Sequence, residues 1–342
     1  MKKIIAIISL LVCMAGMFSC ENDDWSFPDF DYTTAYFPYQ YPVRTLILGD
    51  YMYDNSYDNN LKFKIGATMG GVYENKKDVV INFQVDPGLI RNLYNATGNT
   101  PILALPQNYY TLSSNNEIVI PKGEFSGSID VQLSEAFFQD ELSVGVNYVI
   151  PLKITQATTD SILVGMPGVS NPDPRVAGDW VLPPKNFTLF AIKYINEYDA
   201  KYLLRGHDQI KDAANNVVDE ITYRDKYVER DEIVNVKTVA RHVARYSNNV
   251  RSSEESPGTF TMDMTFGSEG NCTITEADGS EFPVSGTGKF VKNGDSWGGE
   301  KRNVLYLDYI VDDGVYTHHV KDTLVFRNRT VTVEQFSPSV QK

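Results

Sequence analysis

Cysteine is scarce in this sequence, with three residues among 342. Cys13 and Cys20 lie within or directly after an apolar N-terminal run, which leaves Cys272 as the one cysteine in the body of the chain. We therefore expect no disulfide within the folded protein, and its stability has to come from a packed core.

Signatures of the common enzyme classes are also missing. The chain has no Gly-x-Ser-x-Gly elbow, no His-Glu-x-x-His motif, no phosphate-binding loop and no dinucleotide fingerprint. Its four histidines are His207, His242, His318 and His319. The last two are adjacent in a predicted strand, so one ring should be packed and the other solvated, and they cannot bind one metal ion together. We expect no catalytic residue, no metal site and no cofactor.

Glycoside hydrolases are an enzyme class that these absences do not exclude. Such enzymes need two carboxylates about 5 to 10 Å apart across a cleft, and 44 acidic residues make some such pair available. Most acids here, however, occupy turn sequences such as VDDG (311–314) and EADGS (276–280), where Asp supports the backbone geometry. Catalysis has no positive support in the sequence.

The one long apolar run is short for a membrane span. Residues 4–18 carry no charge and follow Lys2 and Lys3. As a helix these fifteen residues would cover roughly 22 Å, less than the roughly 30 Å of a bilayer core. This is the pattern of an export signal. The formal charge of −13 also disfavours nucleic acid and anionic membrane surfaces as partners.

Cys20 follows the apolar run in the stretch MFSCENDDW (17–25), with Ser19 before it and acidic residues after it. This stretch resembles the lipoprotein box of Bacteroidetes surface lipoproteins. The resemblance implies a signal peptide over residues 1–19, an acylated Cys20 that anchors the protein in the outer-membrane bilayer facing outward, and an acidic tether over residues 20–34. An ordinary secretory signal with a chance cysteine is the alternative.

Apolar and polar residues alternate along much of the remaining chain, which is the period of half-buried strands. Gly, Pro and Asn clusters separate these strands and favour a sandwich over βαβ units. Only PGLIRNLYN (87–95) indicates a helical turn or two. The predicted inward faces are Val79, Ile81, Phe83 and Val85; Phe125, Ile129, Val131 and Leu133; Tyr148, Ile150, Leu152 and Ile154; and Phe260, Met262, Met264 and Phe266.

The stretch GMPGVSNPDPRVAGDW (165–180) divides the chain. It has three prolines, three glycines and almost no periodicity, so we interpret it as a linker between domains over residues 35–164 and 181–338. In the second domain, Asp278–Gly279 and Asp313–Gly314 predict consecutive hairpins, as in an antiparallel meander or closed barrel.

Residues 186–206, NFTLFAIKYINEYDAKYLLRG, are ambiguous. Leu189, Ile192 and Ile195 would share one face of a helix. The abundance of Phe, Thr, Ile and Tyr and the interrupting NEYDA favour two strands instead.

Several motifs carry a family resemblance. LYNATGN (93–99), the stretch from LPQNYY to IDVQL (105–133) and YVIPLKIT (148–155) are similar to an immunoglobulin-like N-terminal domain of unknown function found in Bacteroidetes surface lipoproteins. FAIKYINEYDAKYLLRG (190–206) and YIVDDGVYTHHVKDTLVFRNR (309–329) resemble the lipocalin-like domain that often follows it. The resemblance implies an all-β fold, with an immunoglobulin-like β-sandwich followed by a lipocalin-like antiparallel β-barrel.

Proteins of this build resemble the accessory glycan-binding lipoproteins of Sus-like polysaccharide utilisation systems. The resemblance implies non-catalytic capture of oligo- or polysaccharide at the cell surface for a Sus-like outer-membrane transporter complex. Two alternatives stay open. One is a structural or adhesin (fimbria-like) surface lipoprotein with no glycan site, and the other, in third place, is a glycoside hydrolase.

Sugar binding calls for an aromatic platform with hydrogen-bonding groups beside it. Trp297 is the strongest candidate, because it lies among glycines in VKNGDSWGGEKRN (291–303), outside any alternating pattern. Asp295, Glu300 and Arg302, together with Lys301, would supply hydrogen bonds beside the ring. The alternative is a tryptophan that folds back to plug one end of the barrel.

Other aromatic residues are weaker candidates for ligand binding. Trp180 follows the linker, and we expect it in a core more than in a site. Tyr53 and Tyr57 lie in GDYMYDNSYDNN (49–60), which is either a second contact surface or a solvated hairpin tip. The acids of this stretch lack EF-hand spacing, and the sequence leaves open whether they hold calcium.

Two short sequences resemble the site at which Bacteroidetes O-glycosylate exported proteins. They are Asp-Ser-Ile (160–162) and Asp-Thr-Leu (322–324). The resemblance implies that Ser161 or Thr323 could carry a glycan.

Overall fold

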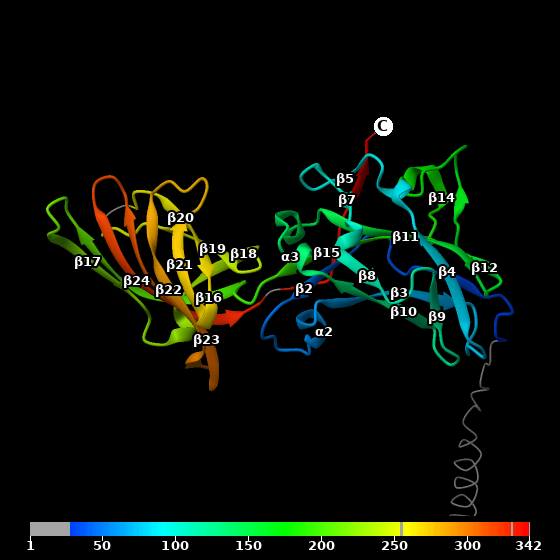
Figure 1. Cartoon of the computed structure of the whole chain (residues 1–342), viewed down its shortest axis with the longest axis horizontal. Coiled ribbons are helices and arrows are strands. Elements are labelled where there is room, and N and C mark those ends of the chain that lie inside the picture. Colours follow the sequence, from blue (N-terminus) through cyan, green and yellow to red (C-terminus); the bar gives the residue numbers. More distant parts are fainter. Residues whose placement is uncertain (1–27, 254–255, 330, 342) are drawn as a thin grey trace, which may run out of the picture.

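The computed structural model describes residues 28–253, 256–329 and 331–341, and it shows two all-β domains side by side (Figure 1). The predicted signal peptide, Cys20 and the first part of the predicted tether lie outside the described residues. Within those ranges, no helix has the length and apolar character needed to cross a membrane.

The first domain packs two sheets face to face. One sheet has the order β12 (Ser161–Ile162), β1 (Thr34–Tyr36), β3 (Lys62–Gly70), β10 (Ser126–Leu133) and β8 (Tyr110–Leu112). The other has the order β25 (Glu334–Gln335), β2 (Pro42–Ile47), β15 (Phe187–Ile195), β11 (Tyr148–Ala157), β4 (Val79–Val85) and β9 (Glu117–Ile120), and β7 (Leu103–Ala104) also pairs with β11. Side chains such as Ile65, Ile81 and Ile150 fill the space between the sheets, as in other β-sandwiches.

The second of these sheets is buried on both faces. Leu189 of β15 and Val149 of β11 belong to a separate apolar cluster that also contains Phe336, from the C-terminal segment. In that segment, β25 pairs with β2, and β26 (Pro338–Val340) pairs with β5 (Leu93–Asn95), which in turn pairs with β6 (Thr100–Pro101). The chain therefore ends in the domain where it began, as the red ribbon in Figure 1 shows.

The second domain is one antiparallel sheet that closes on itself. Its strands are β16 (Ala200–Lys211), β18 (Glu232–Ala240), β19 (Val243–Asn249), β20 (Thr259–Phe266), β21 (Asn271–Glu276), β22 (Val284–Trp297), β23 (Glu300–Asp312) and β24 (Thr317–Asn328). Pairing of β16 with β24, from Lys201↔Asn328 to Lys211↔Thr317, closes these eight strands into a barrel. A further strand, β17 (Val217–Tyr223), pairs with the second half of β16. Closure removes the free edges of an open sheet.

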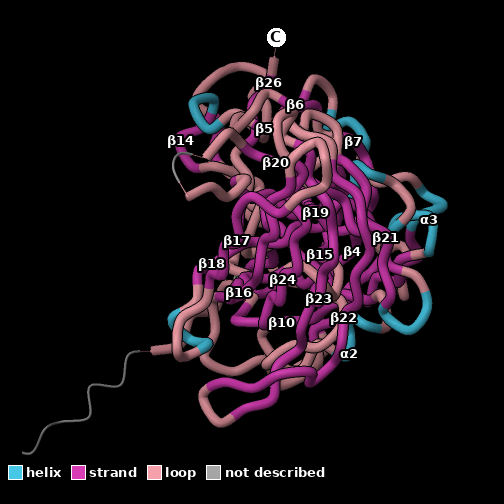
Figure 2. Tube along the Cα trace, turned by 90° about the vertical axis from the view of Figure 1, so that its left-hand side faces the viewer, coloured by secondary structure: helices cyan, strands magenta, loops and turns pink. Residues whose placement is uncertain are grey.

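Helical segments are short and lie at the periphery (Figure 2). The turn predicted within residues 87–95 is present as η1 (Pro87–Ile90). A small hairpin, β13 (Met166–Pro167) with β14 (Trp180–Leu182), projects from the first domain. The other helical segments are α2 (Ser56–Asn59), α3 (Glu135–Phe138), η2 (Gln107–Tyr109), η3 (Glu141–Val144), η4 (Ala177–Asp179), η5 (Val228–Arg230) and η6 (Ser268–Gly270).

The predicted fold class, a sandwich followed by an antiparallel barrel, is confirmed. Most residues of the predicted inward faces are buried, but Val85 and Phe125 are each 37% exposed. Val85 is the last residue of β4 and Phe125 directly precedes β10, so both lie at strand ends. The turns at Asp278–Gly279 and Asp313–Gly314 join β21 to β22 and β23 to β24, as predicted.

The domain boundary differs from the predicted one. Residues 186–206 form two strands, as expected, but β15 pairs with β11 and β2 of the sandwich, and the barrel sheet begins at Ala200 rather than at residue 181. The stretch 165–180 is therefore not the connection between the domains. The reason is a parallel pairing of β15 with β2, a strand more than a hundred residues earlier, which the pattern of residues along the chain does not reveal.

The chain crosses between the domains twice, from β15 to β16 and from β24 to β25. At the first crossing, the Asn196 side chain donates to the carbonyl oxygens of Ala240 and Val243, both at 2.9 Å. Asp199 accepts hydrogen bonds from the backbone N–H and the hydroxyl of Thr238, at 2.7 and 2.9 Å. The connector is therefore fixed to the barrel by buried polar contacts.

Arg329 stands at the second crossing and is only 8% exposed. Its guanidinium donates to the carbonyl oxygens of Leu48, in the first domain, and Glu197, in the connector. Gly49 lies against the same connector with φ +80°, and a Cβ there would overlap the Cβ of Glu197. The loop after β2, the connector and the end of β24 therefore meet at one packed junction.

Replacing the guanidinium at this junction should destabilise the protein. Arg329→Met leaves the carbonyl groups of Leu48 and Glu197 without their donor. We expect the free energy of unfolding, measured by urea titration, to fall by about 2 to 4 kcal/mol. Arg327→Met, two residues earlier on β24, is the matched control because no described carboxylate or carbonyl pairs with Arg327. Equal unfolding midpoints for the two variants would contradict the assigned role.

Candidate functional site

The described side chains leave no room for a ligand inside the barrel. Buried side chains fill it, among them Tyr202, Tyr246, Met262 and Met264. The enclosed space at the barrel mouth is about 10 Å³, which is no more than a single water needs. The likeness to lipocalins therefore extends to the strand arrangement and not to a central ligand cavity in the described barrel.

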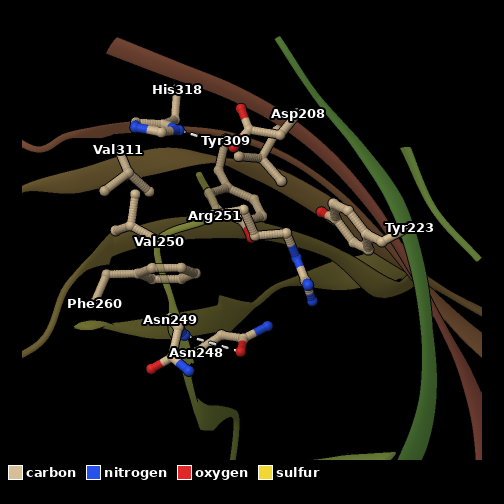
Figure 3. Close-up of a pocket in the computed structure, with 11 residues that line it drawn as sticks. Asp208, Tyr223, Asn248, Asn249, Val250, Arg251, Phe260, Tyr309, Val311 and His318 are labelled. Carbon is tan, nitrogen blue, oxygen red and sulfur yellow. Dashed lines mark hydrogen bonds and ion pairs between the residues drawn. The ribbon is translucent and has the colours of Figure 1, made fainter. Parts of the chain in front are cut away.

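A buried polar network closes the barrel mouth. Asp322, 2% exposed, accepts hydrogen bonds from the hydroxyl groups of Tyr223 and Tyr309. Burial raises the pKa of Asp322 to about 6, although the two hydroxyl groups and Arg251 act in the opposite direction. Arg251 lies over the Tyr223 ring, 3.8 Å from its centre, and the two are adjacent in Figure 3.

His318 lines the same barrel mouth and makes polar contacts of its own. Its Nδ1 lies 2.8 Å from Asp208 Oδ2, the pair joined by a dashed line in Figure 3, and its Nε2 lies 3.3 Å from Asp313 Oδ2. Burial works against the charged ring, but the two carboxylates raise the pKa of His318 above its ordinary value. His319 is half-buried on the other face of β24, as predicted for adjacent strand residues. Across the described residues, no group of three or more His, Cys, Asp or Glu side chains is arranged to hold a metal ion.

A larger hollow lies between the two domains. This interdomain cleft has a volume of about 560 Å³, within the range of small-molecule sites. The loop between β2 and α2 forms the first wall of the cleft. The β22–β23 hairpin and the end of β24 form the second wall; the loop and the hairpin lie in the lower part of Figure 1. The lining residues are Asp50, Tyr51, Met52, Asn293, Lys301, Arg302, Asn303, Phe326, Arg327, Asn328 and Arg329.

The first wall is held by polar contacts within the loop. Asp58 of α2 accepts from the backbone N–H of Ile47 at 2.9 Å and pairs with Arg44, and burial raises the pKa of this carboxyl group. The Asn55 side chain donates to the carbonyl oxygens of Ile47 and Gly49, at 2.8 and 2.7 Å. The stretch 49–60 is thus a supported loop with one helical turn, not the hairpin tip that was the alternative expectation.

This support allows the loop to present large side chains to solvent. Met52 is 78% exposed and Tyr53 is 67% exposed. The rings of Tyr51 and Tyr53 meet edge to face, with their centres 5.7 Å apart. Exposed apolar groups gathered in one place are typical of binding surfaces.

Trp297 packs beneath the second wall of the cleft, between Arg302 and the outside of the barrel. It is the last residue of β22, and Gly298 and Gly299, with φ +63° and +80°, form the two-residue turn into β23. The indole packs against Leu203, Val304 and Val325 on the outside of the barrel.

The same indole orients a residue that lines the cleft. Its N–H donates to the carbonyl oxygen of Phe326 at 2.9 Å, and the Arg302 guanidinium lies 4.3 Å from the ring centre. Trp297 therefore neither plugs the barrel nor extends into solvent on a loop. It holds Arg302 beside the cleft.

The other predicted site residues are distributed over several places. Asp295 accepts a hydrogen bond from the backbone N–H of Ser296, and Glu300 is the strand partner of Trp297 across the turn. Neither residue is part of the cleft lining, although both lie beside it. Tyr53 contacts Tyr51, which is in the lining.

Two predicted residues point elsewhere. The Tyr57 ring lies under Lys64, 5.3 Å away, and its hydroxyl reaches Asp130, so it faces β3 and β10. The Trp180 indole donates to the carbonyl oxygen of Asp173 at 2.7 Å, in the β14 hairpin at the end of the sandwich distant from the barrel (Figure 1). Of the two possible O-glycosylation residues, Ser161 lies in β12 and Thr323 in β24, both half-buried.

Sequence reasoning missed the contribution of the β24 end to the cleft. Phe326, Arg327 and Asn328 lie next to Arg302 and Asn303 because β23 and β24 are paired. A signal was present, since KRN (301–303) and RNR (327–329) are basic runs in an acidic chain. Nothing in the sequence showed that the two runs meet.

Three solved structures illustrate what the chain is similar to. A Bacteroides ovatus protein of unknown function is 40% identical, with a TM-score of 0.85, and the match covers 91% of this chain and all of that one. A Bacteroides ovatus multidomain protein that includes DUF1735 is 12% identical (86% and 94% covered, TM-score 0.43), and an auxiliary nutrient binding protein from Bacteroides thetaiotaomicron is 13% identical (83% and 90% covered, TM-score 0.38). The last two likenesses are too weak to say what this chain binds. No curated protein matches the chain.

Two family descriptions match parts of the chain. An N-terminal domain family matches residues 30–161, and the domain of unknown function DUF5627 matches residues 197–330. The fold and cleft define a two-domain all-β protein with a sandwich, a filled barrel and a hollow between them. The chain belongs to the same family as the Bacteroides ovatus protein of unknown function.

The barrel-mouth network should give a pH-dependent stability. A carboxyl pKa raised to about 6 in the folded protein contributes stability below about pH 4, and this contribution is lost as the pH rises through 6. Asp322→Asn removes this titration. The free energy of unfolding of the variant, measured in urea relative to the wild type, should therefore rise by about 3 kcal/mol between pH 4 and pH 7. Asp308→Asn on the outer face of the barrel is the control. A pH-independent difference would contradict the assignment.

The role of Trp297 can be measured by unfolding. Trp297→Ala exposes Leu203, Val304 and Val325, and because the ring is half-buried we expect a loss of about 2 kcal/mol. Trp297→Phe keeps the apolar contact and loses the indole N–H bond, at a cost of about 1 kcal/mol. If Trp297→Ala unfolds like the wild type, the ring is not structural and is free for a ligand.

Proposed function

We propose that this protein is a non-catalytic, lipid-anchored glycan-binding protein of the bacterial outer-membrane surface, and that the interdomain cleft is its binding site. It would capture oligo- or polysaccharide and present it to a Sus-like transporter complex. The observation that carries the proposal is the cleft itself, which combines exposed aromatic and apolar groups on one wall with amides and guanidinium groups on the other.

The chemistry of the two walls suits a sugar. Tyr51 and Met52 offer apolar surface for the C–H faces of a ring. On the opposite wall, the amides of Asn293, Asn303 and Asn328 can both donate to and accept from hydroxyl groups. Affinity from so few contacts should be modest, of order micromolar to millimolar. Many anchored copies beside a transporter would raise the effective concentration.

The carboxylates of the cleft favour binding over hydrolysis. Among the described lining residues Asp50 is the one carboxylate, and Lys292 pairs with it at 3.2 Å. Hydrolysis of a glycosidic bond by the common mechanisms needs two carboxylates across the bond. This arrangement supports a binding role.

The proposed localisation at the outer-membrane surface rests on the sequence. The apolar run, the small residue before Cys20 and the acids after it fit an acylated cysteine at the N-terminus of the mature chain. A sandwich between the anchor and the cleft would act as a spacer. Mass spectrometry of the membrane-extracted protein tests the acylation directly.

The binding role is tested with the protein lacking its export signal, by affinity electrophoresis and calorimetry against plant and host glycans. Retarded migration in at least one polysaccharide gel, without release of reducing sugar, is the expected result. Release of reducing sugar would overturn the non-catalytic assignment, and no retardation in any gel would overturn glycan binding.

Tyr53 provides the sharpest variant for the first wall. Because it is 67% exposed, Tyr53→Ala should change stability by less than about 0.5 kcal/mol. It should weaken glycan binding about tenfold, because Tyr51 in the lining loses the ring that packs against it. Tyr57→Ala is the matched control, since that ring belongs to the same loop and faces Lys64 instead. Equal losses in the two variants would argue against the cleft as the site.

A further inference from the structure

The charge of the interdomain cleft is opposite to that of the chain. The protein carries a formal charge of −13. Four cationic residues, Lys301, Arg302, Arg327 and Arg329, line the cleft, against the single described carboxylate of Asp50. The net charge of the chain therefore does not show the charge of this cleft. At physiological salt, charges more than roughly 8 Å from a bound ligand are largely screened, so the nearby cations dominate.

The described part of the protein leaves three of these four cations without a carboxylate partner. Elsewhere most guanidinium groups are paired with carboxylates, as in Arg44–Asp58, Arg175–Asp173, Arg205–Asp231, Arg241–Glu135, Arg245–Asp263 and Arg251–Glu232. Within the described chain, no carboxylate lies within ion-pair distance of Lys301, Arg302 or Arg327, and Asp50 is already engaged by Lys292. The cleft therefore has cationic groups without partners.

Two of the guanidinium groups are also fixed in place. Arg302 is held over the Trp297 ring, and its Nε is buried with no hydrogen-bond partner. Arg329 is more than nine-tenths buried, donates with its terminal nitrogens to Leu48 and Glu197, and likewise leaves Nε without a partner. Fixed cations lose little conformational entropy when they bind an anion.

We propose that the cleft selects acidic glycans, in which a carboxylate or sulfate group on a sugar meets Arg302, Arg327 and Lys301. This inference rests on the proposed glycan-binding function and narrows its ligand class. Guanidinium groups match the planar geometry of carboxylate and can also bind sulfate with two hydrogen bonds. The asparagines and Tyr51 remain for the hydroxyl groups and the ring face of the same sugar.

The surroundings of the cleft also limit the charge density of the ligand. A volume of about 560 Å³ fits a few sugar residues, and the net charge of −13 repels the remainder of a long polyanion. The inferred ligand is therefore an oligosaccharide or chain end with an isolated acidic residue. A nucleic acid, with a charge on every residue, fits this surface poorly.

The test compares charged and neutral partners of the same sugar. Calorimetry with the protein lacking its export signal uses 3′-sialyllactose against lactose, and trigalacturonate against its methyl ester. The charged member of at least one pair should bind at least tenfold more tightly, and its affinity should fall as sodium chloride is raised. Polyglutamate is the control for unspecific attraction between opposite charges.

Charge-removing variants locate the effect. Lys301→Gln and Arg327→Gln should each weaken binding of the charged sugar about tenfold, and binding of the neutral sugar by a clearly smaller factor. Lys321→Gln is the matched control, because this substitution also removes one positive charge from β24. Lys321 pairs with Asp308 at 3.5 Å, away from the cleft. Arg329 is left intact because it holds the junction.

The possible outcomes separate the two proposals. Neutral sugars bound as tightly as their charged partners would overturn the acidic-glycan inference and leave glycan binding intact. Polyglutamate bound as well as the charged sugars would overturn the inference, because the cleft would then recognise charge alone. Failure to bind any sugar in this set, or in the polysaccharide gels, would overturn both.

Discussion

The candidate site depends on the packed junction where the chain crosses twice between the domains. Arg329 joins the end of β24 to the loop after β2 and to the connector, and Gly49 allows that loop to approach the connector closely. Because buried donors and acceptors cannot be separated without losing their hydrogen bonds, this junction sets the angle between the domains. The width of the cleft, and the distance between Tyr51 and Arg302 across it, follow from that angle.

The filled barrel explains why the site lies outside it. Eight strands leave an interior that side chains can fill completely, and here aromatic and methionine residues do so. The mouth is closed by the hydrogen-bonded network around Asp322, so the described residues leave no central cavity in the barrel. The barrel instead supplies its outer wall, and the β22–β23 hairpin is long enough to extend past the barrel and face the sandwich.

The relation between sequence and site is clearest at Trp297. The glycines around it predict an exposed ring on an irregular loop with Arg302 beside it, whereas the ring ends β22 before the Gly298–Gly299 turn and packs against Arg302. Whether the ring contacts ligand or protein depended on Leu203, Val304 and Val325, which come from three different strands. The same limit applies to Arg327, because its position beside Arg302 results from strand pairing and not from sequence distance.

The sequence by itself determined the all-β class, the buried faces of strands such as 79–83 and 260–266, and the hairpins at Asp278 and Asp313, because these follow from alternation and turn chemistry over a few residues. Tertiary structure alone decided that β15 belongs to the sandwich, that the C-terminus returns to the first domain, and that two basic runs meet in one cleft. Each of these depends on contacts between segments far apart in the chain, whose partners are selected by packing and closure of the whole fold and not by local pattern.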